Sequence, residues 1–304
     1  MVTVVPHVLR AGVAGHTPLV LLHAFPVDAR MWSAVGRLIT TSTPVIAVDL
    51  PGMGAAPTPD EAPALEAAAD AVAALLSGAD PAESADPARP ADSARPADSA
   101  PAADPARPTD SAPAADPARP AVPAGPAVVA GLSMGGYVAL ALAERHPELV
   151  AALALLDTKA VADTSEAAAN RRRIADEAER TGSVDPVRPM VDAVLGDTTR
   201  ATRPDLVRQL TGWIDEQRPA GIAWSQRAMA ARPDRSHVLR GWTRPALVLV
   251  GAEDGPTPPE QAAAMADLLG IEPVVVPAAG HLTAIEQPTA VAQALTTLLI
   301  RTDR

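Results

Sequence analysis

The sequence predicts an α/β protein with a mostly parallel central sheet, helices on both faces and a helical cap. Short, continuous apolar runs alternate with helix-forming stretches along most of the 304 residues. The alternation stops between residues 157 and 235, and one apolar run ends in a serine flanked by glycines just before a helix. Strands that are apolar throughout are typical of parallel sheets covered on both sides, because neither face meets water.

The predicted elements follow one another in regular order. Expected strands are short apolar runs, at 17–22, 45–48, 127–130, 150–156, 245–250 and 273–276. Expected helices are longer and rich in alanine and leucine, at 28–39, 61–76, 137–146, 259–269 and 287–300. Residues 2–10 are expected to add one or two antiparallel strands at an edge of the sheet.

Two segments interrupt this order within a single expected domain, 1–304. Between residues 80 and 121 an aspartate recurs every sixth residue among prolines and alanines, without Leu or Ile to build a core. We therefore expect 79–125 to be a disordered insert. Residues 158–235 are expected to form the cap, as several short helices broken at Pro186, Pro189, Pro204 and Pro219.

Composition excludes several classes of function. The net charge of −11 argues against general affinity for nucleic acid, and the triplet Arg171-Arg172-Arg173 is expected to be a solvated turn of a helix. The chain has no cysteine, which excludes disulfides and thiolate metal sites. It shows no signal peptide and no apolar stretch long enough for a bilayer, so we expect a cytoplasmic protein without a membrane partner. The composition is compatible with both a monomer and a homo-oligomer.

The stretch Gly131-Leu132-Ser133-Met134-Gly135 carries the strongest functional signal. It lies between an apolar run and a helix-forming run, which is the context of a nucleophile elbow. Glycines allow strand and helix to approach closely, and the turn exposes the Ser133 hydroxyl at a helix N-terminus. We therefore predict that Ser133 is a nucleophile.

A serine nucleophile needs a base and an orienting acid. His281 follows Gly280 in a loop between the last strand and the last helix, and it is the strongest base among six histidines. Asp254 follows the strand 245–250 and is the predicted acid, while Glu253 would point the other way. Asp157, at the end of the strand 150–156, remains the alternative acid. The order serine, acid, histidine is the one associated with this elbow.

An oxyanion hole needs two N–H donors close to the developing charge. The backbone of Met134, next to the nucleophile, is the first expected donor. The second is expected from Phe25, in the loop after the strand 17–22. His23 is expected to brace that loop by hydrogen bonding rather than to act in catalysis.

These motifs together resemble the α/β-hydrolase family, in particular its small-ester and lactone branch and the 3-oxoadipate enol-lactonase-like hydrolases. The residues that carry the resemblance are His23-Ala24-Phe25-Pro26, Asp49-Leu50-Pro51-Gly52-Met53-Gly54, the Ser133 pentapeptide with Gly136, Gly251-Ala252-Glu253-Asp254 and Gly280-His281. The resemblance implies an α/β-hydrolase fold and hydrolysis of a small carboxylic ester or lactone through an acyl-enzyme at Ser133, with no metal and no cofactor.

Two other functions remain open from the sequence. One is a cofactor-free perhydrolase of the haloperoxidase type, in which the same triad passes the acyl group to hydrogen peroxide. The other is a non-catalytic, ligand-binding member of the fold, because a fold by itself does not fix function.

Overall fold

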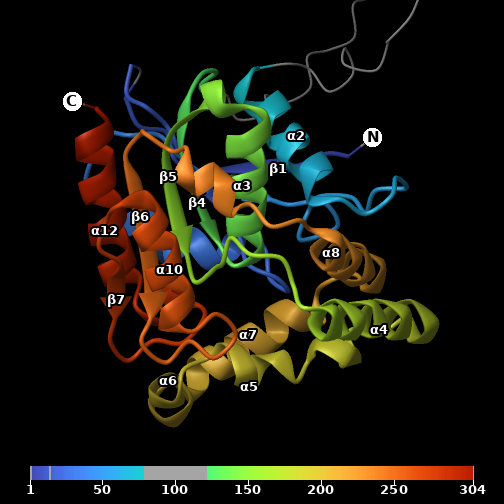
Figure 1. The fold of residues 1–304 in the computed structure, drawn as a ribbon. Helices are drawn as coiled ribbons and strands as arrows, with labels where there is room; N and C mark the ends of the chain where they lie inside the picture. Colours follow the sequence, from blue (N-terminus) through green and yellow to red (C-terminus); the bar gives the residue numbers. More distant parts are fainter. Residues whose placement is uncertain (1, 14, 79–121, 304) are drawn as a thin grey trace, which may run out of the picture.

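A computed structural model describes residues 2–13, 15–78 and 122–303 (Figure 1). Within them, seven strands form one sheet in the order β1-β3-β2-β4-β5-β6-β7. The strands are β1 (Val5–Arg10), β2 (Leu19–Leu22), β3 (Val45–Asp49), β4 (Ala127–Leu132), β5 (Val150–Leu156), β6 (Ala246–Gly251) and β7 (Val274–Val276). β1 runs antiparallel to β3, and the other neighbouring strands are parallel. The predicted fold class and the antiparallel edge strand are thereby confirmed.

The central strands are buried along their whole length. Every residue of β2, β3, β4 and β6 is buried, and these residues are almost all Val, Leu, Ala and Ile. Apolar side chains point alternately to the two faces of a strand, so burial of all of them requires cover on both sides of the sheet. Helices provide that cover.

Two groups of helices cover the sheet, on either side of it in Figure 1. On one side α3 (Met134–Arg145) packs against β2, β4 and β5, and α2 (Leu65–Leu76) packs against α3. On the other side α12 (Pro288–Thr302) packs against β5, β6 and the short helix α1 (Ser33–Leu38). The remaining helices of this part are η1 (Ala29–Trp32), η2 (Pro147–Leu149), α9 (Ser236–Arg240), α10 (Pro259–Leu269) and α11 (Thr283–Glu286).

Two predicted helix starts are wrong by a few residues. α2 begins at Leu65 rather than residue 61, because Pro63 restricts the residue before it to extended backbone. α3 begins at Met134 rather than residue 137, so that the helix follows Ser133 directly. The second difference matters for function, since it brings the free N–H groups of the first helical turn next to the serine.

Between β5 and α9 the chain forms a layer of helices that we call the cap. It comprises α4 (Ser165–Thr181), η3 (Asp185–Val187), α5 (Met190–Val194), α6 (Asp197–Thr202), α7 (Pro204–Asp215) and α8 (Pro219–Ala231). α4 and α8 pack side by side, and the cap lies at the end of the sheet to which the parallel strands point (Figure 1). Pro204 and Pro219 start α7 and α8 rather than break them, since proline is well suited to a first helical position.

The predicted insert 79–125 lies outside the described residues except for 122–125. Its two flanks lie side by side, because the Gly125 N–H donates to the Leu76 carbonyl at 2.8 Å. This bond brings the end of α2 close to the start of β4. Among the helices of the described part, none is long and apolar enough to cross a membrane.

Candidate active site

Ser133 lies at the sharp turn between β4 and α3. Its backbone has φ 54° and ψ −112°, a left-handed conformation that is costly for a residue with a side chain. A Cβ on Gly131 would overlap the backbone of Gly135, and a Cβ on Gly135 would overlap the Leu22 carbonyl of β2. Both glycines are therefore required for packing, and they hold the serine at the apex of the turn.

The three side chains predicted to act together form one hydrogen-bonded chain. Ser133 Oγ lies 2.8 Å from His281 Nε2, and His281 Nδ1 lies 2.9 Å from both carboxylate oxygens of Asp254. All three residues are at most 9% exposed. Because a carboxylate can only accept, Nδ1 carries the proton and Nε2 of a neutral imidazole is free to accept from the serine hydroxyl.

Thr257 completes this chain, and the sequence analysis did not identify it. Its N–H donates to Asp254 Oδ1 at 2.9 Å, and its hydroxyl donates to Oδ2 at 2.8 Å. Thr257 Oγ1 also lies 3.1 Å from His281 Nδ1. The signal available in the sequence was its position three residues after an aspartate, the spacing at which a carboxylate accepts from a backbone N–H in helix N-caps.

The alternative acid, Asp157, contacts other partners. One of its carboxylate oxygens accepts from the Gly251 N–H at 2.9 Å, and the other accepts from the N–H and hydroxyl of Thr283 at 3.2 and 2.5 Å. Complete burial and the nearby charge of Asp254 raise the pKa of the Asp157 carboxyl well above its ordinary value. Asp157 thus ties the end of β6, which precedes Asp254, to the start of α11, which follows His281.

The neighbouring Glu253 points away from the imidazole, in agreement with the sequence analysis. Its carboxylate accepts from the N–H of Thr198 at 2.8 Å, at the start of α6. Four other histidines also pair with carboxylates away from Ser133: His7 with Asp49, His16 with Asp303, His146 with Asp70 and His237 with Glu144. His281 is therefore the histidine that the fold brings to the serine.

The two residues expected to donate to the oxyanion both lie near the serine. Met134 is the first residue of α3, and Phe25 lines the cavity at Ser133. His23 braces the Phe25 loop, as expected: its Nδ1–H donates to the Ala24 carbonyl at 2.8 Å, and its Nε2 accepts from the Leu50 N–H at 2.9 Å. Burial lowers the pKa of His23, which keeps the imidazole neutral and suited to these two opposite roles.

The cap closes over the site. A cavity of about 70 Å³ lies between Ser133 and His281 on one side and the cap residues Arg171, Met190 and Met229 on the other. Arg171 is half-buried there, whereas its neighbours Arg172 and Arg173 are both exposed. The prediction that the whole triplet is a solvated turn is therefore wrong for its first member, because Arg171 contacts Asp163 and the α8 residues Gln226 and Met229.

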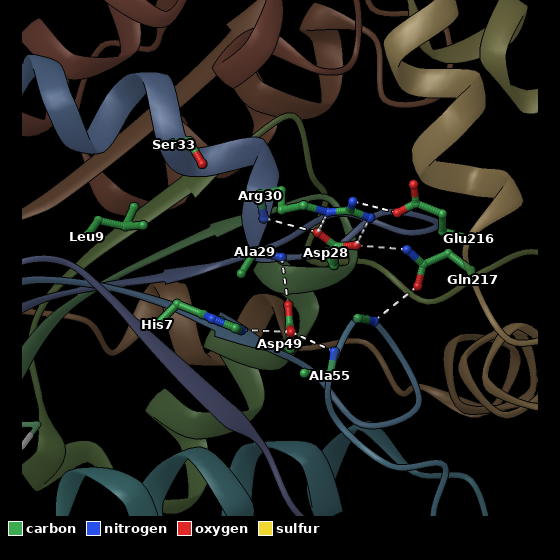
Figure 2. Close-up of a pocket in the computed structure, with 11 residues that line it drawn as sticks. His7, Leu9, Asp28, Ala29, Arg30, Ser33, Asp49, Ala55, Glu216 and Gln217 are labelled. Atoms are coloured by element: carbon green, nitrogen blue, oxygen red, sulfur yellow. Dashed lines mark hydrogen bonds and ion pairs between the residues drawn. The ribbon is translucent and has the colours of Figure 1, made fainter. Parts of the chain in front are cut away.

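A larger pocket of about 410 Å³ lies away from the triad, between the Phe25 loop, β1 and the end of α7 (Figure 2). Gln217 joins its walls: Nε2 donates to Asp28 Oδ2 at 2.8 Å, and Oε1 accepts from the Gly54 N–H at 3.0 Å. Asp49 accepts from the N–H groups of Ala29 and Ala55, both at 2.8 Å. Apart from Ser33, the polar side chains drawn in Figure 2 are joined by hydrogen bonds and ion pairs, so this pocket lies at the junction between the cap and the loops of the sheet.

Within the described residues, no group of three or more His, Asp or Glu side chains is arranged to hold a metal ion. At the site itself, a serine hydroxyl in contact with an imidazole lies beside the first turn of α3 and the loop that carries Phe25. Such an arrangement suits nucleophilic attack on a carbonyl carbon.

Comparison with known proteins identifies the family to which this fold belongs. Residues 17–288 match the model of the alpha/beta hydrolase fold family, so the chain belongs to the α/β-hydrolase family. Among solved structures, it is similar to a thermophilic esterase from Thermogutta terrifontis, solved with malate bound, at 30% identity and TM-score 0.79 over 99% of this chain and 94% of that one. An enol-lactonase from Burkholderia xenovorans LB400 shares the fold, at 21% identity and TM-score 0.72 over 98% and 96% of the two chains.

A protein named as a non-heme bromoperoxidase, BpoC of Mycobacterium tuberculosis, is 31% identical over 180 residues, which cover 56% of this chain and 66% of that protein. The chain spans slightly less than two thirds of the length of the curated relatives it matches.

Proposed function

We propose that the protein is a serine hydrolase that cleaves a small carboxylic ester or lactone through an acyl-enzyme at Ser133. The observation that carries the proposal is the continuous chain from Ser133 Oγ through His281 to Asp254, with both links at hydrogen-bonding distance. A nucleophile, a base and an orienting acid in contact are the minimum set for this chemistry.

In the first half of the reaction, Ser133 Oγ attacks the carbonyl carbon and its proton passes to His281 Nε2. The Asp254 carboxylate stabilises the imidazolium that forms, and the backbone N–H groups of Met134 and Phe25 would donate to the oxyanion. Collapse of the tetrahedral intermediate breaks the bond to the leaving oxygen, which takes the proton from Nε2. A lactone would keep its new hydroxyl on the acyl group.

In the second half, water attacks the acyl carbon and gives a proton to His281 Nε2, and that proton then returns to Ser133 Oγ as the acid leaves. The small cavity beneath the cap favours a short acyl group, since pockets for drug-sized ligands have volumes of several hundred Å³. We therefore expect acetyl to butyryl esters to react faster than octanoyl esters.

Labelling with a fluorophosphonate ester, followed by peptide mass spectrometry, tests the proposal. We expect a single label on Ser133 in the parent protein and none in Ser133→Ala, which should also lose ester turnover. The loss should come without a large change in melting temperature, because alanine fits the same turn and Ser133 is already buried. Folded parent protein that takes no label and hydrolyses no short ester would favour a non-catalytic, ligand-binding protein instead.

Similarity to a bromoperoxidase favours a second candidate, a perhydrolase in which hydrogen peroxide replaces water in the second half. The acyl-enzyme would then yield a peracid, which oxidises bromide in solution. Bromination of monochlorodimedone in acetate and peroxide, compared between parent and Ser133→Ala, distinguishes this reaction from hydrolysis alone. Equal bromination by both proteins would exclude it.

A further inference from the structure

Three cationic side chains surround one buried carboxylate beneath the cap. Asp163 Oδ2 lies 2.8 Å from Arg232 Nη1 and 2.6 Å from Arg171 Nε, and Asp163 Oδ1 lies 3.1 Å from Lys159 Nζ. The Asp163 side chain is only 2% exposed. Three positive charges thus share a single negative partner.

Arg232 is the structural partner of Asp163. It is as buried as Asp163, donates to the carbonyls of Met229 and Val161, and lies 3.9 Å above the Tyr137 ring. Burial by itself raises the pKa of the Asp163 carboxyl, but hydrogen bonds from Arg232 and the charges of Arg171 and Arg232 lower it below its ordinary value. Asp163 is therefore ionised, and its single negative charge balances only one of the three positive charges around it.

Lys159 and Arg171 remain as two cations without a matching negative charge in this cluster. Both line the cavity that contains Ser133 and His281, and both side chains are about one fifth exposed, at 19% and 22%. The Asp254 carboxylate does not neutralise them, because it contacts His281 Nδ1, the nitrogen turned away from the serine. Positive charge in a small, largely buried cavity is costly unless an anion pairs with it.

Arg171 is also held in place. Besides Asp163, its Nη1 donates to the Gln226 side chain of α8 at 3.1 Å. A guanidinium fixed in this way is preorganised to bind a carboxylate, because little side-chain freedom is lost on binding.

Building on the proposed function, we propose that the substrate carries a carboxylate on its acyl chain and that Lys159 and Arg171 bind it. The substrate class is then half-esters of short dicarboxylic acids, or lactones with a free carboxylate. The carboxylate would sit at the cavity wall opposite the serine, and it would orient the carbonyl carbon for attack by Ser133 Oγ. The two cations thus determine specificity, while the triad performs the reaction.

The test uses substrates that differ in charge but hardly in shape. Monoethyl esters of succinic, glutaric and adipic acid are compared with the corresponding ethyl ester amides, and ethanol release gives kcat/KM. The parent protein should prefer the acid over its amide about tenfold or more at the best chain length, the size expected for a charge-assisted hydrogen bond. That preference should shrink as salt is added.

Lys159→Gln and Arg171→Gln should each lower the ratio of the acid to the amide rate by about tenfold. Arg172→Gln is the matched control, because it removes the same charge from the next, exposed position of α4. It should leave the ratio at the parent value. A parent ratio near one at every chain length, or equal ratios in all the variants, would overturn the proposal.

If a variant fails to fold, inhibition of the parent protein decides instead. Glutarate should compete with a neutral short ester at least tenfold better than glutaramide, and equal inhibition would overturn the proposal. The experiments distinguish an error in the substrate class from an error in the proposed function. If only the carboxylate site is wrong, Ser133 is still labelled and neutral esters are still hydrolysed; if the hydrolase function is wrong, both are absent.

Discussion

Gln217 is the residue whose replacement most directly tests how the cap is attached. It is 6% exposed, and its side-chain amide makes three hydrogen bonds: to Asp28 Oδ2 at 2.8 Å, to the Trp213 carbonyl at 3.0 Å and from the Gly54 N–H at 3.0 Å. These bonds join the end of α7 to the loop that follows β2 and to the loop that follows β3 (Figure 2). We propose Gln217→Met, which keeps the length of the side chain but removes all three bonds.

The expected loss follows from the partners left behind. Each hydrogen bond contributes about 1 kcal/mol net, and more when a carboxylate accepts, so three bonds amount to about 3 to 4 kcal/mol. The pocket of about 410 Å³ beside Gln217 lets water reach the freed groups and reduces the loss. We therefore expect the free energy of unfolding to fall by about 2 to 3 kcal/mol.

Urea unfolding measures this change, with Gln209→Met as the matched control on the exposed face of α7. The control should change stability by less than about 0.5 kcal/mol. Because Asp28 lies in the loop that carries Phe25, Gln217→Met should also lower kcat/KM for short esters. Equal urea midpoints for the two variants, with equal activity, would refute the idea that Gln217 holds the cap to the sheet.

Three further predictions concern the orientation of Asp254, the stability of the protein at low pH and the insert. Thr257→Val should lower kcat about tenfold with little change in KM, because Asp254 loses one of the donors that orient it, and Thr257→Ser should restore kcat. Burial raises the pKa of the Asp28 and Asp163 carboxyls, but hydrogen bonds from arginine outweigh it and lower both pKa values. The two carboxylates therefore contribute their full share of the free energy of unfolding above about pH 4, and this contribution is lost as the pH falls through the lowered pKa values. Urea midpoints from pH 6 to pH 2.5 should therefore fall in acid, and Asp163→Asn should flatten that fall; a parallel decline in both proteins would contradict this origin. Replacing 80–121 by a short linker should leave turnover and melting temperature near the parent values, because the flanks lie side by side, and a variant that does not fold would show that the tract takes part in the fold.

Local sequence was sufficient to predict the strands and the elbow. β5 has the predicted bounds, because a short apolar run between turn residues is typical of a strand in a parallel sheet. α10 also has the predicted bounds, because Pro259 suits a first helical position and Gly270 ends the helix. The elbow was equally visible, since Gly131 and Gly135 are demanded by contacts that any side chain would prevent. His281 and Asp254 could be proposed because each follows a predicted strand, at the edge of the sheet where Ser133 had to lie.

Which aspartate contacts His281 could be decided only from the tertiary structure. Asp157 and Asp254 both follow buried strands, and the sequence leaves both open as partners of the histidine. In the structure β6 pairs with β7, which brings the Asp254 loop against the loop that ends in His281, while Asp157 is occupied by Gly251 and Thr283. Pairing between strands depends on residues far apart in the chain, so no local pattern encodes it.

The sequence by itself thus determined the fold class, the strained serine and the set of residues that can serve it, because these depend on local backbone sterics and on the pattern of apolar residues. Only the tertiary structure decided that Thr257 holds Asp254, that Gln217 joins the cap to the sheet loops, and that Lys159 and Arg171 line the cavity of the serine while Arg172 is exposed. Those contacts arise where the cap meets the strand ends, and the position of one helix over a sheet is set by packing across the whole interface rather than by any short stretch of chain.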